Sequence, residues 1–144
     1  MAFDQADYFL IPLLDGQFGV GQILELADTK EGAPFCGISA RRAGAGSRID
    51  PLQLNEIIAF VRVFPSALVT GTWPLAGFDQ IPRFRDVFDF EGARALGFAD
   101  TPVRDPAVIE AFVSAWHGLY AWDAFGEIFE QIKRQDLDRP APTT

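Results

Sequence analysis

His117 and Cys36 are the only histidine and the only cysteine among the 144 residues of the chain. A nucleophilic site of the Cys–His or Ser–His type would have to use His117, and nothing in the sequence indicates that a cysteine or serine meets it. His117 follows Trp116 on an expected helix, which favours a packed or surface side chain. One histidine excludes a His-rich metal site, and one cysteine excludes a cysteine pair for structural zinc. The sequence thus predicts no catalytic residue, no bound metal and no cofactor.

Carboxylates form the second group that could do chemistry, since the chain has 20 aspartates and glutamates. Asp86, Asp89 and Glu91 cluster around Phe88 and Phe90. In a strand, Asp89 and Glu91 would point to one side and the two phenylalanines to the other. That pattern is typical of a solvated face over a packed one. It also fits an acidic patch for a basic partner, and a carboxylate acid–base pair or metal site stays open as an alternative.

Glycines and arginines in the first third of the chain are candidates for holding an anion. Gly16, Gly19 and Gly21 lack the lysine and the serine or threonine of a Walker motif, and they lie within an expected hairpin. A phosphate or dinucleotide loop is therefore not predicted. A glycine-rich stretch further on, typical of a mobile and solvated loop, carries three basic side chains: Arg41, Arg42 and Arg48.

Composition excludes several classes of partner. Hydrophobic residues make up 49% of the chain, and the net charge is -8 with an isoelectric point near 4.5. This charge opposes binding to nucleic acid or to an anionic membrane and favours a basic protein partner. The single cysteine fits a reducing compartment, and the apolar run at 8–14 is too short to span a membrane and lacks a basic start. We therefore expect a cytoplasmic protein.

Apolar and alternating runs predict a sheet over roughly residues 7–80. Residues 8–14 and 17–27 should pair as an antiparallel hairpin across Asp15-Gly16, a dipeptide that favours tight turns. Residues 72–78 fit a final strand or an irregular edge, because Pro74 cannot donate to a ladder. Two further strands and one turn of helix are expected at 33–40, 57–64 and 67–70.

The rest of the chain predicts helices after an irregular excursion at 81–104 that packs on the sheet. Asp105 and Pro106 are typical of an N-cap and a first helical position, so helices are expected over 105–135. A second helix should begin around Asp123, and the tail at 138–144 should fray. We predict one α+β domain over residues 1–144: a twisted antiparallel sheet, with a partly open SH3-like barrel as one arrangement, and C-terminal helices packed on it.

Three blocks of sequence carry a further signal. The first reads IPLLDGQFGVGQIL over residues 11–24, the second ALVTGTWPLAG over 67–77, and the third HGLYAWD over 117–123. In this order they resemble the immunity protein 26 family of bacterial polymorphic toxin systems. The residues that carry the resemblance are Pro12, Gly16, Gly19, Gly21, Gly71, Trp73, Gly77, Gly118, Trp122 and Asp123.

The resemblance implies a mostly β fold with a helical C-terminal part and a role in neutralising a cognate toxin by direct binding. The acidic charge leads us to expect a basic toxin domain. Ala121 stands where the family pattern has a proline, and residues 41–52 and 84–106 match nothing in it. Some relatives carry a phosphotriesterase label, but metal-dependent chemistry of that kind needs several histidine ligands.

We interpret the motif residues as structural. Gly16 suits a turn with positive φ, Asp123 should cap the final helix, and Trp73 and Trp122 should pack with a partner for each indole N–H. The sequence favours a binding protein over an enzyme. Two alternatives stay open: a carboxylate-based hydrolase, and a small-molecule-binding module with an aromatic pocket.

Overall fold

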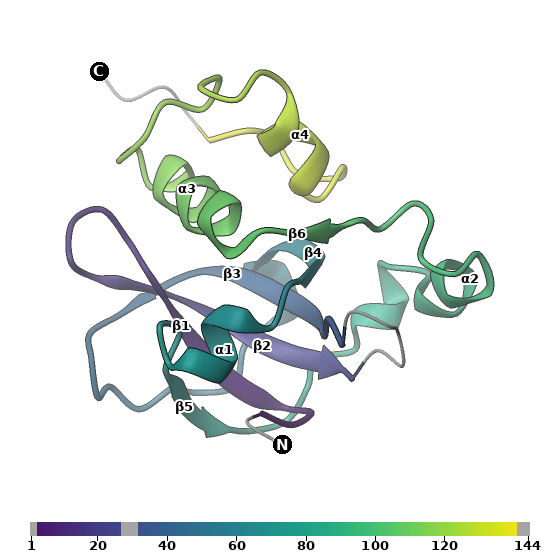
Figure 1. The fold of residues 1–144 in the computed structure, drawn as a ribbon, viewed down its shortest axis with the longest axis horizontal. Helices are drawn as coiled ribbons and strands as arrows, with labels where there is room; N and C mark the ends of the chain where they lie inside the picture. The colour runs from purple at the N-terminus through teal and green to yellow at the C-terminus, as the bar shows by residue number, and fades with distance from the viewer. Residues whose placement is uncertain (1–2, 27–31, 141–144) are drawn as a thin grey trace.

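A computed structural model describes residues 3–26 and 32–140 and shows an α+β fold built on one open, mostly antiparallel sheet (Figure 1). The six strands are arranged in the order β5-β1-β2-β3-β4-β6. Their bounds are Asp7–Pro12 (β1), Phe18–Glu25 (β2), Phe35–Ala43 (β3), Ile57–Val63 (β4), Leu75–Phe78 (β5) and Val103–Arg104 (β6). The predicted fold class is confirmed.

The hairpin predicted at the start of the chain is confirmed. β1 and β2 pair antiparallel, from Tyr8 opposite Gln22 to Pro12 opposite Phe18. The turn between them closes with a hydrogen bond from the Leu13 N–H to the Gln17 carbonyl oxygen, at 2.9 Å. Gly16 has a φ of 83°, a backbone conformation that side chains with a Cβ rarely adopt, so the glycine of the Asp-Gly pair is required there.

The strands that follow also lie where the sequence predicts them, but β3 is longer. It continues to Ala43, so Arg41 and Arg42 belong to a strand and not to the predicted loop. The reason is that β2 supplies ladder partners this far, with Gly19 opposite Arg42 and Phe18 opposite Ala43. β4 and the single turn of α1 (Ser66–Thr70) match their predictions, and β5 forms the expected edge strand beside β1.

The excursion at 81–104 contains more regular structure than the sequence indicated. β6 lies within it and pairs in parallel with β4, so the sheet is mixed and is not confined to residues 7–80. A 3-10 turn spans Phe84–Asp86 and a helix, α2, spans Phe90–Ala95. The strand-like alternation predicted around Phe88 is therefore wrong, because the Asp89 side chain accepts a hydrogen bond from the Gly92 N–H and starts a helix.

The C-terminal helices are shorter than predicted. α3 spans Pro106–Trp116, and Asp105 caps it as expected by accepting a hydrogen bond from the Ala107 N–H at 2.8 Å. α4 spans only Ile128–Ile132, with Glu127 and not Asp123 at its N-cap, so that prediction is wrong. Gly126 has a φ of 67°, which breaks any helix that would start earlier. Part of the tail expected to fray, residues 141–144, lies outside the described residues.

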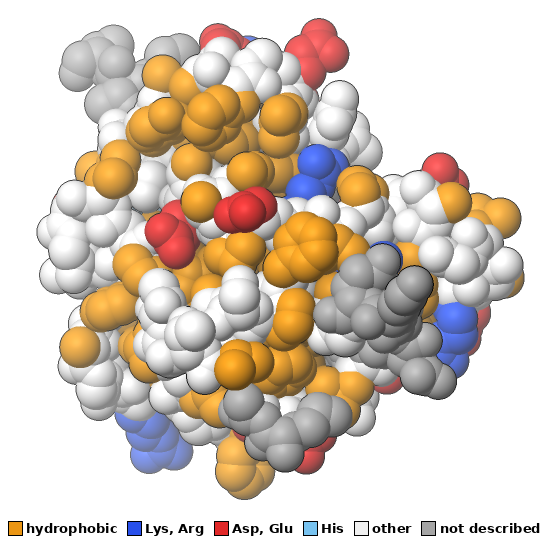
Figure 2. Space-filling view, in the orientation of Figure 1, with side chains coloured by type: hydrophobic (Ala, Val, Ile, Leu, Met, Phe, Trp, Pro, Cys, Tyr) orange, Lys and Arg blue, Asp and Glu red, His pale blue; other side chains and the backbone are white. Residues whose placement is uncertain are grey.

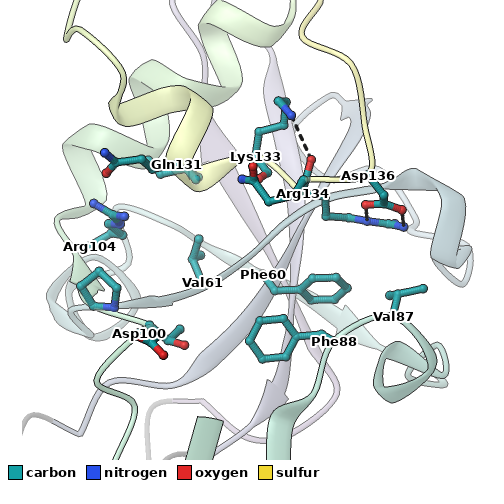
Figure 3. Close-up of a pocket in the computed structure, with 14 residues that line it drawn as sticks. Phe60, Val61, Val87, Phe88, Asp100, Arg104, Gln131, Lys133, Arg134 and Asp136 are labelled. Carbon is teal, nitrogen blue, oxygen red and sulfur yellow. Dashed lines mark hydrogen bonds and ion pairs between the residues drawn. The ribbon is translucent and has the colours of Figure 1, made fainter. Parts of the chain in front are cut away.

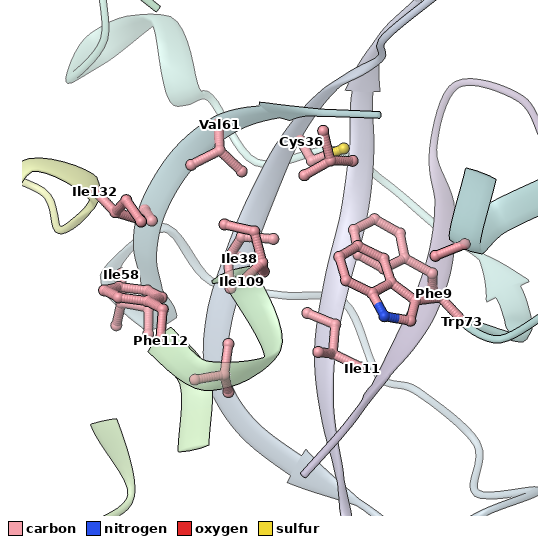
Figure 4. Packing of buried hydrophobic residues seen from close by; sticks show 14 of the residues in the cluster. Phe9, Ile11, Cys36, Ile38, Ile58, Val61, Trp73, Ile109, Phe112 and Ile132 are labelled. Atoms are coloured by element: carbon pink, nitrogen blue, oxygen red, sulfur yellow. The ribbon is translucent and has the colours of Figure 1, made fainter. Parts of the chain in front are cut away.

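Both faces of the sheet are covered, which explains why β2 is buried along most of its length. One face packs against α3 and α4, with Ile11, Ile38, Ile109 and Phe112 among the contacts (Figure 4). The other face packs against the excursion through a cluster that includes Phe35, Phe84, Phe90 and Phe98. Close packing explains the glycines of β2: a Cβ at Gly21 would overlap the ring of Phe9, and one at Gly19 would lie 2.9 Å from Val113.

Candidate functional site

The open edge of the sheet, at β5, exposes large apolar side chains. Phe78 is 76% exposed and Leu75 is 42% exposed, and Val69 of the preceding α1 is exposed as well. Hydrophobic side chains gather on the face of the molecule on which α1 and β5 lie (Figure 2). Since β5 pairs only with β1 in the described part of the chain, its outer backbone groups are also available to a partner. We call the set Val69, Leu75 and Phe78 the β5 surface.

Trp73 packs in the core next to the β5 surface and anchors the segment between α1 and β5. Its ring is completely buried and stacks on Phe9 of β1, with ring centroids 5.4 Å apart and planes 6° apart. Its indole N–H donates to a carboxylate oxygen of Glu110 on α3, at 2.9 Å. The predicted partner for this indole therefore exists. Gly71 ends α1 and Gly77 lies within β5, so the second sequence block forms the segment that supports the β5 surface.

Acidic side chains lie beside the β5 surface. Asp7 is directly opposite Phe78 in the β1–β5 ladder, and Asp79 is the next residue along the chain. The Asp7 carboxylate also accepts a hydrogen bond from the Asp4 N–H, at 2.7 Å, so Asp4 lies next to Asp7. None of these three carboxylates forms an ion pair with a lysine or arginine of residues 3–26 and 32–140. No ion pair within the part of the chain that the structure describes therefore balances their negative charge.

The three carboxylates chosen from the sequence lie elsewhere and are engaged with their neighbours. Asp86 pairs with Arg83 at 3.5 Å, and Glu91 pairs with Arg85 at 3.2 Å. Asp89 is used to cap α2. These side chains lie around α2, and two of them, Asp86 and Glu91, pair with nearby arginines. The sequence did not single out Asp4, Asp7 and Asp79 as a group, because only the pairing of β1 with β5 places Asp79 near the other two.

The third sequence block packs at the border of the core. Trp122 is 9% exposed, and its indole N–H donates to Glu130 at 2.8 Å, so its predicted burial and indole partner are both confirmed. Gly118 lies two residues after the end of α3. Asp123 forms an exposed ion pair with Arg139 at 3.1 Å in place of the predicted cap. This block thus fastens the C-terminal segment to the core.

The arginines of the expected loop are held by the protein itself. Arg41 makes two hydrogen bonds to the carboxylate of Glu56, one of 2.9 Å and one of 2.6 Å, and Arg42 pairs with Asp15. Burial alone would raise the pKa of Glu56, but the hydrogen bonds from Arg41 and from the Gln53 N–H leave that pKa lowered. Arg41 and Arg42 therefore have carboxylate partners already, and of the three only Arg48, which is exposed, has none among the described residues.

Cys36 and His117, the two candidates for nucleophilic chemistry, lie on different elements of the fold. Cys36 lies in the core on β3, where burial raises the pKa of its thiol far above the ordinary value and keeps it protonated. His117 follows α3, and burial together with the nearby charge of Arg42 lowers its pKa from 6.5. The described residues contain no group of three or more histidine, cysteine or acidic side chains that could hold a metal ion.

The lowered pKa of His117 predicts a pH-dependent stability. A histidine that binds its proton less tightly in the folded state favours unfolding when it is protonated, so stability should fall as the pH drops through 6.5. We expect the urea midpoint to be lower at about pH 5.5 than at about pH 7.5, a window above the titration of most carboxylates. His117→Asn should reduce this difference. An unchanged difference in the variant would contradict the assignment to His117.

A pocket of about 480 Å³ lies near the edge of the sheet opposite to β5. It forms where β4, the excursion and the residues following α4 meet (Figure 3). Its walls are apolar in the middle, where the rings of Phe60 and Phe88 lie 5.4 Å apart. Arg104 and Gln131 lie at one end, and Val87 and Asp136 at the other (Figure 3). A pocket of this size is within the range of small-molecule sites.

Comparison of the chain with protein-family models, with characterised proteins and with solved structures found no match. Among the described helices, none has the length and apolar character needed to cross a bilayer. Two features of the described residues could carry the function: the β5 surface with its carboxylates, and the pocket beside β4.

Proposed function

We propose that the protein is a binding protein that neutralises a cognate toxin by direct contact, with the β5 surface as its principal contact. One observation carries the proposal: exposed Phe78 and Leu75 lie on an open sheet edge, beside carboxylates that have no cationic partner among the described residues. The resemblance of the three sequence blocks to an immunity family supports the same class of function.

The apolar side chains and the strand edge would supply most of the affinity. Aromatic side chains that become buried at the centre of an interface commonly dominate its binding energy, and Phe78 is the most exposed of the large hydrophobic residues described. A strand of the partner could also pair with β5, since extended segments often bind by adding to a free sheet edge. Inhibition would follow from occlusion, because a protein seated on the toxin blocks access to its active surface.

The carboxylates select a basic partner. Asp4, Asp7 and Asp79 add local negative charge to a chain whose net charge is already -8. Such a surface attracts a positively charged protein over a distance of about one Debye length, roughly 8–10 Å at physiological salt. This charge is expected to raise the association rate more than it lowers the dissociation rate.

The test is binding to the candidate toxin encoded by the neighbouring gene, measured by surface plasmon resonance at low and high salt. Phe78→Ser should weaken binding about tenfold or more, mainly through faster dissociation. Replacing Asp4, Asp7 and Asp79 together with asparagine should slow association about tenfold at low salt and much less at high salt. Each asparagine keeps an acceptor oxygen for the existing hydrogen bonds.

Two matched variants serve as controls. Leu96→Ser removes another exposed apolar side chain, far along the chain beyond α2, and should leave binding unchanged. Replacing Asp86, Asp89 and Glu91 tests the carboxylates chosen from the sequence, and we expect a smaller effect on association than for the three near β5. Failure to form any complex with the neighbouring gene product would overturn the immunity function, and equal effects of Phe78→Ser and Leu96→Ser would overturn the assignment to β5.

A further inference from the structure

We propose that the pocket beside β4 binds a small organic anion, a carboxylate on an aromatic or aliphatic body, with Arg104 as the residue that recognises its charge. This site is separate from the β5 surface, because β5 and β6 are the two opposite edges of the sheet. The inference does not depend on the identity of the protein partner.

The pocket has a floor suited to an apolar body. Phe60 and Val61 come from β4, Phe88 from the excursion and Ile132 from α4, so three segments far apart in sequence converge on one space. Phe60 and Phe88 are only partly buried, which leaves part of each ring available to a ligand. With a volume of about 480 Å³, the space accommodates a bicyclic ring system or a short acyl chain.

Two of the three cationic side chains that line the pocket already have partners within the protein. Lys133 is 6% exposed, and its ammonium group donates to the carbonyl oxygens of Arg134 and Leu137, at 3.1 and 2.6 Å. The guanidinium of Arg134 donates to the carbonyl oxygens of Leu54 and Ile57, at 2.9 and 3.0 Å, and pairs with Asp136. These groups hold the C-terminal segment against β4 and have little capacity left for a ligand.

Arg104 differs from these cations. Its side chain is half-buried at one end of the pocket, and it forms no side-chain hydrogen bond or ion pair with any residue that the structure describes. Its backbone is fixed by pairing with Val63 of β4 and by accepting a hydrogen bond from the Phe64 N–H at 3.0 Å. Burial lowers the pKa of Arg104, which reflects the cost of removing its charge from water without a compensating anion.

A carboxylate is the group that this arrangement lacks. A guanidinium binds a carboxylate through two parallel hydrogen bonds, and such bonds are stronger where water is partly excluded. Asp100, a carboxylate that lines the pocket at this end, is exposed and forms no ion pair with any arginine or lysine that the structure describes (Figure 3). The charge of Asp100 would repel a ligand carboxylate, so the carboxylate should contact Arg104 on the side away from Asp100, with the apolar body over Phe60 and Phe88 in the middle of the pocket (Figure 3).

The experiment is an NMR titration of the ¹⁵N-labelled protein with two probes that share a naphthalene body, anionic 1-naphthoate and neutral 1-naphthalenemethanol. We expect naphthoate to shift the amide resonances of pocket residues and to bind about tenfold or more tightly than the alcohol. Arg104→Gln should remove that preference while leaving the affinity for the alcohol unchanged. Arg104→Lys should keep part of the preference, which separates loss of charge from loss of fold.

Arg83→Gln is the matched control, because Arg83 is an exposed arginine of the excursion that does not line this pocket. It should leave both affinities unchanged. The proposal is overturned if neither probe binds, if naphthoate and the alcohol bind equally well, or if Arg104→Gln and Arg83→Gln weaken naphthoate binding to the same extent. None of these outcomes bears on the toxin complex, which is tested by variants at the other edge.

Discussion

Trp73→Ala is expected to lower the free energy of unfolding by about 4 kcal/mol, the largest effect of any single substitution proposed for this chain. The ring is completely buried and lies parallel to Phe9, so alanine would leave a cavity between β1 and α3. The substitution would also remove the indole N–H that donates a hydrogen bond to the Glu110 carboxylate. The measurement is equilibrium unfolding in urea, followed by far-ultraviolet circular dichroism.

Two companion variants show whether packing causes this loss. Trp73→Phe keeps an aromatic ring beside Phe9 and removes only the N–H donor, so it should cost less than half as much. Val69→Ala shortens an exposed side chain in the neighbouring α1 and should change stability by less than about 1 kcal/mol. If Trp73→Ala shifted the midpoint no more than Val69→Ala does, the segment that supports the β5 surface would not depend on this tryptophan.

Trp122→Ala is expected to destabilise the fold by about 3 kcal/mol. Its ring packs against Phe112, Trp116 and Phe129, with centroid distances of 5.8, 6.0 and 5.5 Å, so it joins the segment before α4 to α3. The loss should be somewhat smaller than for Trp73, since Trp122 is at the border of the core and not in its centre. Thermal and urea unfolding of the purified variant provide the measurement.

The neighbouring residue offers the control for Trp122. Asp123→Ala removes an exposed ion pair with Arg139, and exposed pairs contribute little, so the cost should stay below about 1 kcal/mol. A large loss for Asp123→Ala and a small one for Trp122→Ala would reverse our assignment and make the aspartate the residue that holds this segment.

Local signals in the sequence were sufficient for part of the fold. The Asp15-Gly16 turn between apolar runs predicted the β1–β2 hairpin, and Asp105 before Pro106 predicted the start of α3, because both depend on neighbouring residues alone. β6 could not be predicted in this way. It has only two residues, and its pairing depends on β4, about 40 positions earlier in the chain.

The errors around α2 and α4 have specific physical causes. Alternating aromatic and acidic residues at 88–91 resemble a strand, but the Asp89 cap gives the backbone a helical alternative that short-range alternation does not reveal. The candidate site was missed for a different reason. Asp79 lies near Asp4 and Asp7 only because β5 pairs with β1, and the walls of the pocket come from three distant segments.

The two edges of the sheet differ in how many backbone groups they leave unpaired, and this difference affects self-association and solubility at high concentration. The edge next to β4 ends in β6, a strand of only two residues, and in Lys133, which bridges to Ala59, whereas β5 presents four residues with no further partner in the described part of the chain. Pairing between two copies would therefore take place edge to edge at β5. Mutual repulsion of chains that each carry a charge of -8 opposes it, so solubility should be lowest near the isoelectric point of about 4.5, where that repulsion vanishes.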